Sequence, residues 1–202
     1  ERGIFNRVSA KNQVQKYGRR DPNYDFGTNP CSEIILRPYQ FCNLTEVVIR
    51  ENDRFDDLKR KVVLATILGT AQSTLTNFPY LRKVWSNNTE EERLLGVSLT
   101  GIMDNELTNG KKQGLEKTLS ALREIAVETN REWSTIFRIP QSTAITCVKP
   151  SGTVSQLVDS ASGIHARHSK YYIRTVRGDN KDPLTQFMID QGVPSEPDVM
   201  KP

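Results

Sequence analysis

The chain carries three short apolar runs that are separated by longer stretches with helical spacing. Residues 42–49 are apolar and rich in β-branched side chains, which favours a buried strand. Residues 94–103 form a second apolar run, which contains two glycines, and residues 143–148 form a third, which Lys149 and Pro150 close. We therefore expect three buried strands in this part of the chain.

Two segments between these runs have apolar residues at the spacing of a helix. The first segment is residues 54–76, and its apolar face contains Leu58, Val62, Ala65 and Gly69. Asn52 or Asp53 can cap the start of this helix, and residues 77–79 should end it. Residues 113–137 show the strongest helical pattern, with an apolar face made of Leu115, Leu119, Leu122, Ala126, Thr129 and Trp133. Strands and helices that alternate in this way predict an α/β sheet with right-handed crossovers.

The remaining segments are less regular. A helix or loop is expected over residues 8–17, and the polar stretch 87–92 indicates no particular element. Residues 170–177 alternate as an exposed strand would, and residues 184–191 predict a short helix that Gly192 ends.

The composition is that of a globular protein and limits the classes of partner. Of 202 residues, 36% are apolar and 26% are charged, which is enough for one domain with a sizeable core. No apolar stretch is long enough to span a bilayer, so no membrane partner is expected. The formal net charge of +4 is spread along the chain, and it would serve a polyphosphate ligand as well as nucleic acid.

The cysteines and histidines predict reduced thiols and no metal site. An odd number of cysteines, three, and no signal peptide argue against a secreted disulfide scaffold, so we expect a cytoplasmic location. His165 and His168 are three residues apart, but no third ligand lies nearby in the sequence, so no metal is expected. Cys147 lies within an apolar run and is interpreted as a small core residue. Because the first residue is Glu, we expect a fragment of a longer chain.

Candidate chemistry concentrates in residues 29–33, where a carboxamide, a thiol and a carboxylate occur close together. A buried glutamate costs several kcal/mol unless it is hydrogen-bonded or transfers protons. Alternate side chains of an extended segment point the same way, so Asn29, Cys31 and Glu33 would share one face and could meet one small ligand. The alternative is a loop with one buried structural cysteine.

A second candidate site is the segment 149–155, which follows a predicted strand. A turn with glycine and hydroxyl side chains leaves backbone N–H groups free to bind an anion, more so where a helix begins. No Gly-Lys-Ser/Thr ending occurs, so the segment is not a Walker A loop. A plain turn rich in serine and threonine is the alternative.

These two segments together resemble a known enzyme family. Asn29-x-Cys31-x-Glu33, with Cys42 eleven residues after Cys31 and a strand behind it, resembles the active-site finger loop of ribonucleotide reductases. The likeness is greatest to the adenosylcobalamin-dependent class II enzymes.

The second motif resembles the substrate-phosphate loop of the same enzymes. Its residues are 150–156, followed by Ser162-Gly163-Ile164. The runs 163–165 and 171–174 are more similar to the cobalamin-dependent enzymes than to the diiron-dependent ones.

The resemblance implies a fold, a domain and a set of partners. Residues 1–202 would be about the second half of a ten-stranded α/β barrel, a partial catalytic domain with the finger loop at 27–43 and the phosphate loop at 149–156. The implied cofactor is adenosylcobalamin, the substrate a ribonucleoside di- or triphosphate, and the reductant an external dithiol such as a thioredoxin-like protein. The missing N-terminal part of the enzyme would be a partner, and the fragment alone is expected to be inactive.

The resemblance also implies a role for each site residue. A thiyl radical on Cys31 would remove the 3′-hydrogen of the ribose, Glu33 would accept the 3′-OH proton, and Asn29 would hold the ribose hydroxyls. Cys42 matches one member of a reducing pair whose partner does not belong to this chain. The substrate phosphates would bind at Ser151, Gly152, Thr153, Val154 and Ser155.

The predicted function is thiyl-radical reduction of ribonucleotides to 2′-deoxyribonucleotides for DNA synthesis, and three alternatives remain open beside it. The chain could belong to the large catalytic subunit of a diiron-dependent class I reductase. It could also be an inactive half-barrel that only assembles with its missing half. A basic nucleic-acid-binding domain is disfavoured, because aromatic residues are not interleaved with basic ones apart from Tyr171 and Tyr172.

Overall fold

The computed structural model describes residues 4–200, so residues 1–3 and 201–202 of the predicted domain 1–202 lie outside the described residues. The chain divides into two compact units, Glu1–Arg167 and His168–Pro202. All the candidate site residues belong to the first unit.

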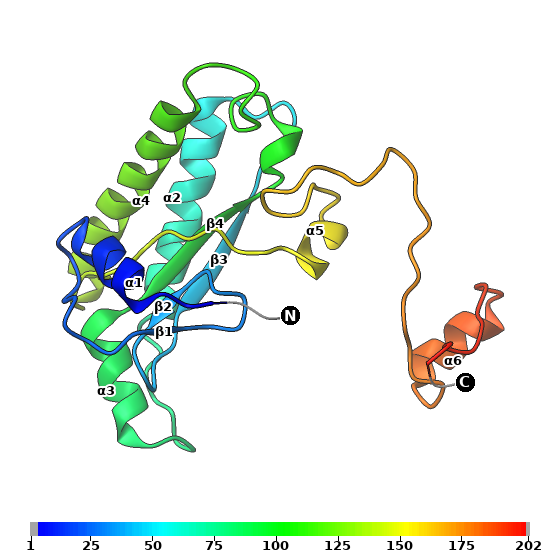
Figure 1. Ribbon diagram of the computed structural model, residues 1–202, viewed down its shortest axis with the longest axis horizontal. Helices are drawn as coiled ribbons and strands as arrows, with labels where there is room; N and C mark the ends of the chain where they lie inside the picture. Colours follow the sequence, from blue (N-terminus) through cyan, green and yellow to red (C-terminus); the bar gives the residue numbers. More distant parts are fainter. Residues whose placement is uncertain (1–3, 201–202) are drawn as a thin grey trace. The chain divides into compact units, whose positions relative to one another are not determined.

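A parallel sheet forms the centre of the first unit (Figure 1). Strand β3 (Asn43–Val48) pairs with β4 (Leu95–Thr100) in one continuous register, so the first two predicted strands are confirmed. On the other side of β4, a single parallel bridge joins Val97 to Thr146. The predicted strand 143–148 is therefore only partly formed, because among residues 4–200 no strand supports its outer edge.

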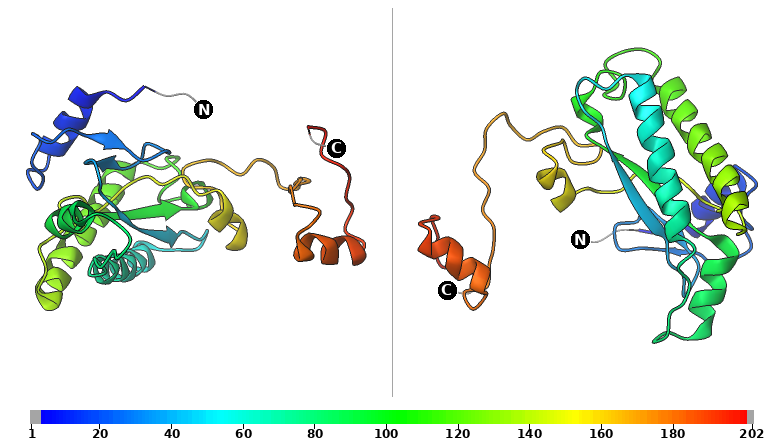
Figure 2. Two further views of the ribbon diagram at one scale, coloured as in Figure 1. Left: turned by 90° about the horizontal axis from the view of Figure 1, so that it is seen from below. Right: turned by 180° about the vertical axis from the view of Figure 1, so that it is seen from behind.

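Two long helices cover one face of this sheet, α2 (Phe55–Gln72) and α4 (Leu115–Phe137) (Figure 2, right). Both were expected from the apolar stripes, which meet the inward side chains of the strands. The buried core between them consists of Val47, Ile49, Leu58, Val62, Leu95, Val97, Leu122, Ala126 and Ile145. The architecture is α/β, as predicted.

The ends of α2 differ from those expected. Neither Asn52 nor Asp53 is the N-cap, because Arg54 takes that place and its backbone N–H donates to Asp57 Oδ2 at 3.0 Å. A carboxylate in the first turn that binds the cap N–H stabilises a helix start. The helix ends at Gln72, before the predicted stop at residues 77–79.

The polar stretch 87–92 is the end of a helix that the pattern does not predict, α3 (Lys83–Glu92). Its buried residues are Thr89 and Glu92, so it has no apolar stripe that could reveal it. Arg93 ends the helix in the left-handed conformation, with a φ of 46°.

A hairpin and a short helix occupy the other face of the sheet. Strand β1 (Gly27–Thr28) pairs antiparallel with β2 (Ile35–Leu36), and α1 (Arg7–Gln15) precedes them, where a helix or loop was expected. A small second core made of Ala10, Val14 and Phe26 joins this helix to the hairpin. In the left view of Figure 2 the hairpin and the two long helices lie on opposite sides of the sheet.

Two short helices complete the first unit. The 3-10 helix η1 (Ile102–Asp104) follows β4, and α5 (Thr153–Leu157) follows the third extended segment, where the phosphate loop was expected. Of the helices within residues 4–200, none has both the length and the apolar character that crossing a membrane requires.

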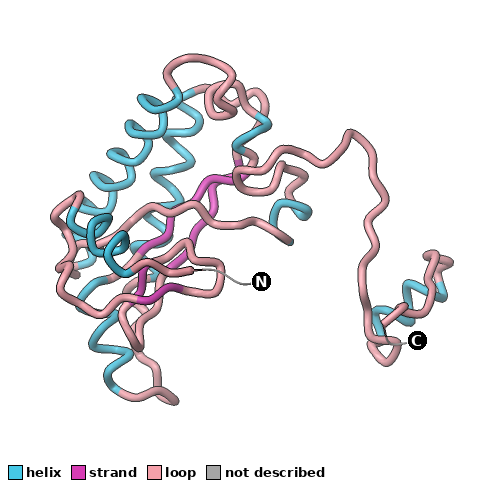
Figure 3. Tube along the Cα trace, viewed as in Figure 1, coloured by secondary structure: helices cyan, strands magenta, loops and turns pink. Residues whose placement is uncertain are grey.

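The second unit contains α6 (Pro183–Asp190), which confirms the helix expected over residues 184–191. The Asp182 side chain caps it by accepting from the N–H of Leu184. The exposed strand expected over 170–177 is wrong, because these residues form a loop (Figure 3). An alternating pattern does not by itself hold a strand, which also needs a neighbouring strand to pair with.

Candidate active site

The tip of the β1–β2 hairpin is a turn, and not the extended segment expected over residues 29–33. The N–H of Ile34 donates to Asn29 Oδ1 at 3.1 Å, and the N–H of Ser32 donates to the Asn29 carbonyl at 3.0 Å. Ser32 has a φ of 63°, in the left-handed region. Asn29 favours this turn because its short amide side chain can bond to the backbone that follows it. The prediction that alternate side chains share one extended face is therefore wrong.

The turn nevertheless brings Asn29 and Glu33 together. The Glu33 side chain is only 2% exposed, and its Oε1 lies 3.0 Å from Lys149 Nζ. Burial alone would raise the pKa of Glu33, but its own backbone N–H, the Lys149 ammonium and the Asn29 side chain hold that pKa below its ordinary value. Glu33 is therefore ionised at neutral pH and can accept a proton. The third predicted residue, Cys31, is exposed in the same turn.

Gly96 of β4 lets the hairpin tip lie against the sheet. A Cβ built on Gly96 would come within 2.4 Å of Leu44 Cδ2, 3.1 Å of Cys147 Sγ and 3.2 Å of Ile34 Cδ1. Its neighbours Leu95 and Val97 belong to the helix-facing core, so Gly96 points to the opposite face. At Gly96, β4 has no side chain, and three segments meet there: the hairpin, β3 and the segment after Ile145.

The half-buried thiol of Cys147 lies on this side of the sheet, and the half-buried thiol of Cys42 lies near it and near Glu33. Burial raises the pKa of Cys42, and the nearby Cys147 raises it further. Burial and then Glu33 raise the pKa of Cys147 to about 12. Both thiols therefore stay protonated at neutral pH. Cys147 was expected to be a core residue, but it lies beside Gly96 and near Glu33, on the face that carries the candidate chemistry.

The predicted phosphate loop, residues 149–156, turns directly into α5. Ser151 is buried, and its hydroxyl has no hydrogen-bond partner among the described residues. The Ser155 hydroxyl donates to the carbonyls of Ser151 and Gly152, at 2.8 and 3.0 Å, so it shapes the turn. Thr153 begins the helix, and the side chains of Thr153 and Val154 are exposed.

Lys149 connects the two predicted motifs. Its side chain binds Glu33 at the hairpin tip, while its backbone N–H donates to Ser98 Oγ of β4 at 2.9 Å. The bond to Glu33 raises the pKa of Lys149, and the thiols of Cys31 and Cys147 raise it further. The sequence names Lys149 as the residue that closes a strand and begins the phosphate loop, and it does not reveal the contact with Glu33, which lies 116 positions away.

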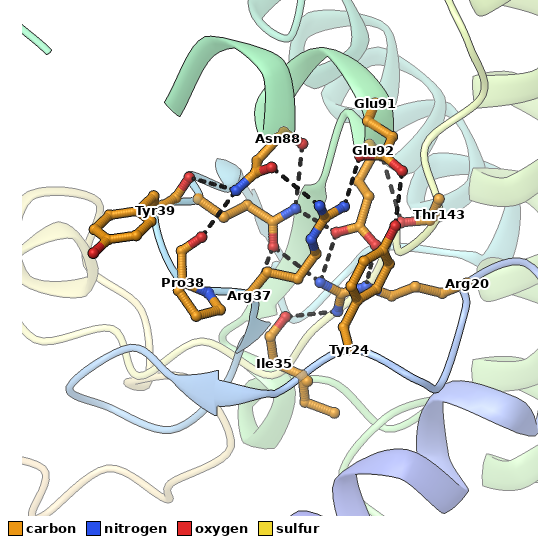
Figure 4. A network of polar contacts seen from close by, with 11 residues as sticks. Arg20, Tyr24, Ile35, Arg37, Pro38, Tyr39, Asn88, Glu91, Glu92 and Thr143 are labelled. Atoms are coloured by element: carbon orange, nitrogen blue, oxygen red, sulfur yellow. Dashed lines mark hydrogen bonds and ion pairs between the residues drawn. The ribbon is translucent and has the colours of Figure 1, made fainter. Parts of the chain in front are cut away.

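A buried network anchors the hairpin to the end of α3 (Figure 4). Arg20 donates from Nε and Nη2 to the two carboxylate oxygens of Glu92, both at 2.8 Å, and both side chains are 3% exposed. Arg20 Nη1 donates to the Ile35 carbonyl of β2 at 2.7 Å, and Nη2 donates to Gln40 Oε1 at 3.0 Å. A bidentate charged pair allows little displacement, so this network fixes the base of the hairpin.

Arg37, which directly follows β2, extends the network to the surface. Arg37 Nη1 lies 2.9 Å from Glu91 Oε2, and the guanidinium stacks 3.7 Å from the centre of the Tyr24 ring. The Tyr24 hydroxyl donates to Glu91 Oε1 at 2.8 Å. Asn88 Nδ2 of α3 donates to the Pro38 carbonyl at 2.9 Å, as Figure 4 shows. Contacts with α3 therefore hold Arg37 and Pro38, the two residues that follow β2.

The two histidines make local contacts within their own units. His165 Nδ1 lies 3.3 Å from the Ser162 carbonyl, and His168 makes an edge contact with the ring of Tyr172. Within residues 4–200, no three His, Cys, Asp or Glu residues are grouped so that they could hold a metal ion.

The chain is similar along its length to adenosylcobalamin-dependent ribonucleoside-triphosphate reductases. The enzyme of Lactobacillus gasseri is 30% identical over 235 residues, which cover 100% of this chain and 30% of that protein. The enzyme of Lactobacillus leichmannii is 28% identical and is matched over 98% of this chain and 30% of its own length. A probable enzyme of this kind from Dictyostelium discoideum is 30% identical, over 85% of this chain and 22% of its length. No protein-family model matches the chain.

One solved structure is similar in its fold. It is the crystal structure of a B12-dependent class II ribonucleotide reductase, with a TM-score of 0.55 and 24% identity. The match covers 69% of this chain and 22% of that one. This match supports the α/β fold. The chain spans about 30% of the length of the Lactobacillus gasseri enzyme.

Proposed function

The chain is homologous over its whole length to part of the adenosylcobalamin-dependent ribonucleoside-triphosphate reductases, and from this premise we propose that it is a catalytic segment of such an enzyme. The proposed reaction converts a ribonucleoside triphosphate and a dithiol into the 2′-deoxyribonucleoside triphosphate, a disulfide and water. The observation that carries the proposal is one hairpin tip that holds a buried, ionised Glu33 beside Asn29 and an exposed Cys31.

The proposed chemistry assigns one task to each of these residues. Cys31, as a thiyl radical, takes the 3′-hydrogen atom of the ribose and becomes a thiol, which leaves a carbon radical on the sugar. Glu33 accepts the proton of the 3′-OH, and the 2′-OH leaves as water with a proton from a thiol. Asn29 holds the ribose hydroxyls by hydrogen bonds. Glu33 then returns its proton to the 3′-oxygen, and Cys31 returns a hydrogen atom to the 3′-carbon and is again a radical.

Cys42 is proposed to supply reducing equivalents together with a thiol outside this chain. The two thiols give two electrons and two protons to the substrate, and a disulfide forms between them. An external dithiol or a thioredoxin-like protein then reduces this disulfide. Burial supports the assignment, because a raised pKa keeps the Cys42 sulfur protonated until it reacts.

The substrate phosphates are proposed to bind at the turn before α5. The Ser151 hydroxyl is buried and has no protein partner, so it is available to donate to an anion, with backbone N–H groups of Gly152, Thr153 and Val154. The Ser155 hydroxyl is already bonded to two carbonyls and is proposed to keep the turn in shape. The Lys149–Glu33 contact supports this placement, because it holds the start of the turn against the hairpin tip.

We further propose that residues 1–202 form about the second half of a ten-stranded barrel and that the missing N-terminal half packs beside β3. An open groove of about 1070 Å³ lies there, between β3 and α2, and we name it the β3–α2 groove. Its lining is mostly apolar and includes the exposed residues Leu44, Leu64, Leu68 and Leu75. Neighbouring leucines that are exposed along one groove favour contact with another apolar surface.

Adenosylcobalamin would supply the oxidising equivalent that forms the radical on Cys31. The hairpin tip suits the formation of this radical, because the Cys31 thiol is exposed there. We assign no residue of this chain to hold the corrin and place its binding in the rest of the enzyme, which we expect in the cytoplasm. The relatives favour this cofactor over a diiron subunit as the radical source.

The test uses the full-length protein that carries this chain, with nucleoside triphosphates, adenosylcobalamin and a dithiol. We expect deoxynucleotide, measured by mass spectrometry, and its complete loss in Cys31→Ser. Tyr80→Ser changes a side chain that is 98% exposed and serves as the control that keeps activity. A wild-type protein that assembles and binds nucleotide but forms no deoxynucleotide would show that the chain is the inactive assembly module instead.

A further inference from the structure

We propose that Lys149 is a positioning residue, which fixes the Glu33 carboxylate at the hairpin tip and ties it to the phosphate loop. The inference rests on the proposed function and goes beyond it, because Lys149 begins the predicted phosphate loop but is not among the residues predicted to act on the substrate. Its basis is one contact between two segments that meet only in the folded chain.

The contact joins a well-fixed segment to the tip of the hairpin. Lys149 Nζ lies 3.0 Å from Glu33 Oε1, and the Lys149 backbone N–H donates to Ser98 Oγ of β4 at 2.9 Å. Lys149 is therefore held by the sheet, whereas Glu33 follows a turn that starts at Asn29. Without the ammonium, the carboxylate would keep only its contacts with its own backbone N–H and the Asn29 side chain, neither of which has good hydrogen-bond geometry.

Burial makes this partner necessary. The Glu33 side chain is 2% exposed and that of Lys149 is 28% exposed, so the carboxylate has little access to water. The titratable groups that face it from the neighbouring segments are the thiols of Cys42 and Cys147, which carry no positive charge at any pH. A buried charge that loses its partner is strongly destabilised. Lys149 is the cation that acts on Glu33, and it also lies near Cys31.

A general base must be both ionised and correctly placed. The ion pair with Lys149 serves both needs, because it favours the charged form of Glu33 and limits its rotation. A residue that acts on the base in this way should change the maximal rate and its pH dependence. It should leave substrate affinity nearly unchanged, because it does not itself bind the substrate in this proposal.

The experiment compares Lys149→Met with Lys149→Arg in the full-length enzyme. We expect kcat of the methionine variant to fall at least about tenfold at pH 7, with KM within about twofold, and the acidic limb of its pH profile to move to higher pH. The arginine variant keeps the charge and should restore most of kcat. A uniform loss at every pH, with no rescue by arginine, would overturn the positioning role. A rise in KM alone would overturn it too and would mark Lys149 as a phosphate ligand.

A second readout does not depend on turnover. Amide hydrogen exchange of residues 27–36, corrected for its intrinsic pH dependence, should be faster in Lys149→Met and in Glu33→Gln than in the wild type at pH 7. In the wild type the protection should fall as the pH drops through the lowered pKa of Glu33, because the protonated acid no longer binds the ammonium. Unchanged exchange in both variants would overturn the inference, even if the wild type reduces nucleotides. A wild type that forms no deoxynucleotide but shows these changes would overturn only the proposed function.

Discussion

A single missing side chain at Gly96 decides how closely the hairpin can approach the sheet. In Gly96→Ala the new Cβ would lie 2.4 Å from Leu44 Cδ2, with Cys147 and Ile34 close on the other sides. We expect overpacking to lower the free energy of unfolding by about 1–3 kcal/mol, measured by urea denaturation. Gly27→Ala is the matched control, because a Cβ there meets nothing within 4 Å. Equal losses in both variants would mean that the space over Gly96 is not limiting.

The three cysteines should differ sharply in their reactivity. Cys31 is exposed, whereas burial raises the pKa of both Cys42 and Cys147, so these two have little thiolate at pH 8. We expect iodoacetamide to modify Cys31 at least about tenfold faster than the other two, as measured by peptide mass spectrometry. In urea the three rates should become similar. Equal rates in the folded chain would contradict the burial of Cys42 and Cys147.

The same raised pKa values predict how stability depends on pH. Unfolded cysteines ionise near pH 8.5, whereas the buried thiols of the folded chain stay neutral. The unfolded state therefore binds fewer protons above this pH, and the free energy of unfolding should fall as the pH rises. Thermal melting of the wild type between pH 7 and about 10 should show this fall. A Cys42→Ala, Cys147→Ala double variant should show a shallower one.

For single residues, the sequence indicates which side chains form the candidate site better than it indicates how they are arranged in space. Asn29, Cys31 and Glu33 stand out because a thiol and two polar groups within one turn are easily noticed. Their shared extended face is wrong, since the Asn29 side chain bonds to the backbone and forms a turn. The contacts of Lys149 and Cys147 with Glu33 are not predicted, because they join segments that lie far apart in the sequence.

Among the elements, the hairpin depends most on one buried ion pair. Arg20 binds the Glu92 carboxylate with two hydrogen bonds, and both side chains are 3% exposed. The Glu92→Gln change removes the negative charge and leaves the buried guanidinium without a charged partner. We expect a loss of about 3–5 kcal/mol in the free energy of unfolding. Glu91→Gln on the same helix is the control, because that side chain is 54% exposed and such pairs contribute about 1 kcal/mol or less. Similar losses for both would show that the buried pair is not the anchor.

The elements that the sequence predicts well are those that bury an apolar stripe. Strands β3 and β4 and helices α2 and α4 all contribute to one core, so their periodicity is visible in the sequence. Helix α3 is missed because it buries Thr89 and Glu92. The strand expected over 170–177 is absent because a pattern of alternation cannot supply a neighbouring strand.

For the whole molecule, the proposed function predicts that the rest of the enzyme packs in the β3–α2 groove. Leu68 of α2 is 63% exposed in this groove, so Leu68→Glu should leave the stability of the isolated chain within about 0.5 kcal/mol. In a pull-down with the cognate N-terminal part, the same change should abolish binding. Ile136→Glu, on α4 and 56% exposed outside the groove, should bind like the wild type. Binding that survives Leu68→Glu would place the interface elsewhere.

Strand β3 pairs only with β4 among the described residues, so no strand covers its outer edge, which lies beside exposed leucines and where Lys61 Nζ donates to the Val48 carbonyl at 3.0 Å. Such an edge accepts a strand from any chain that reaches it. When this segment is produced alone, copies should therefore stack edge to edge and precipitate as their concentration rises. Poor solubility of the chain would in this case reflect an uncovered strand edge and would not mean that the chain misfolds.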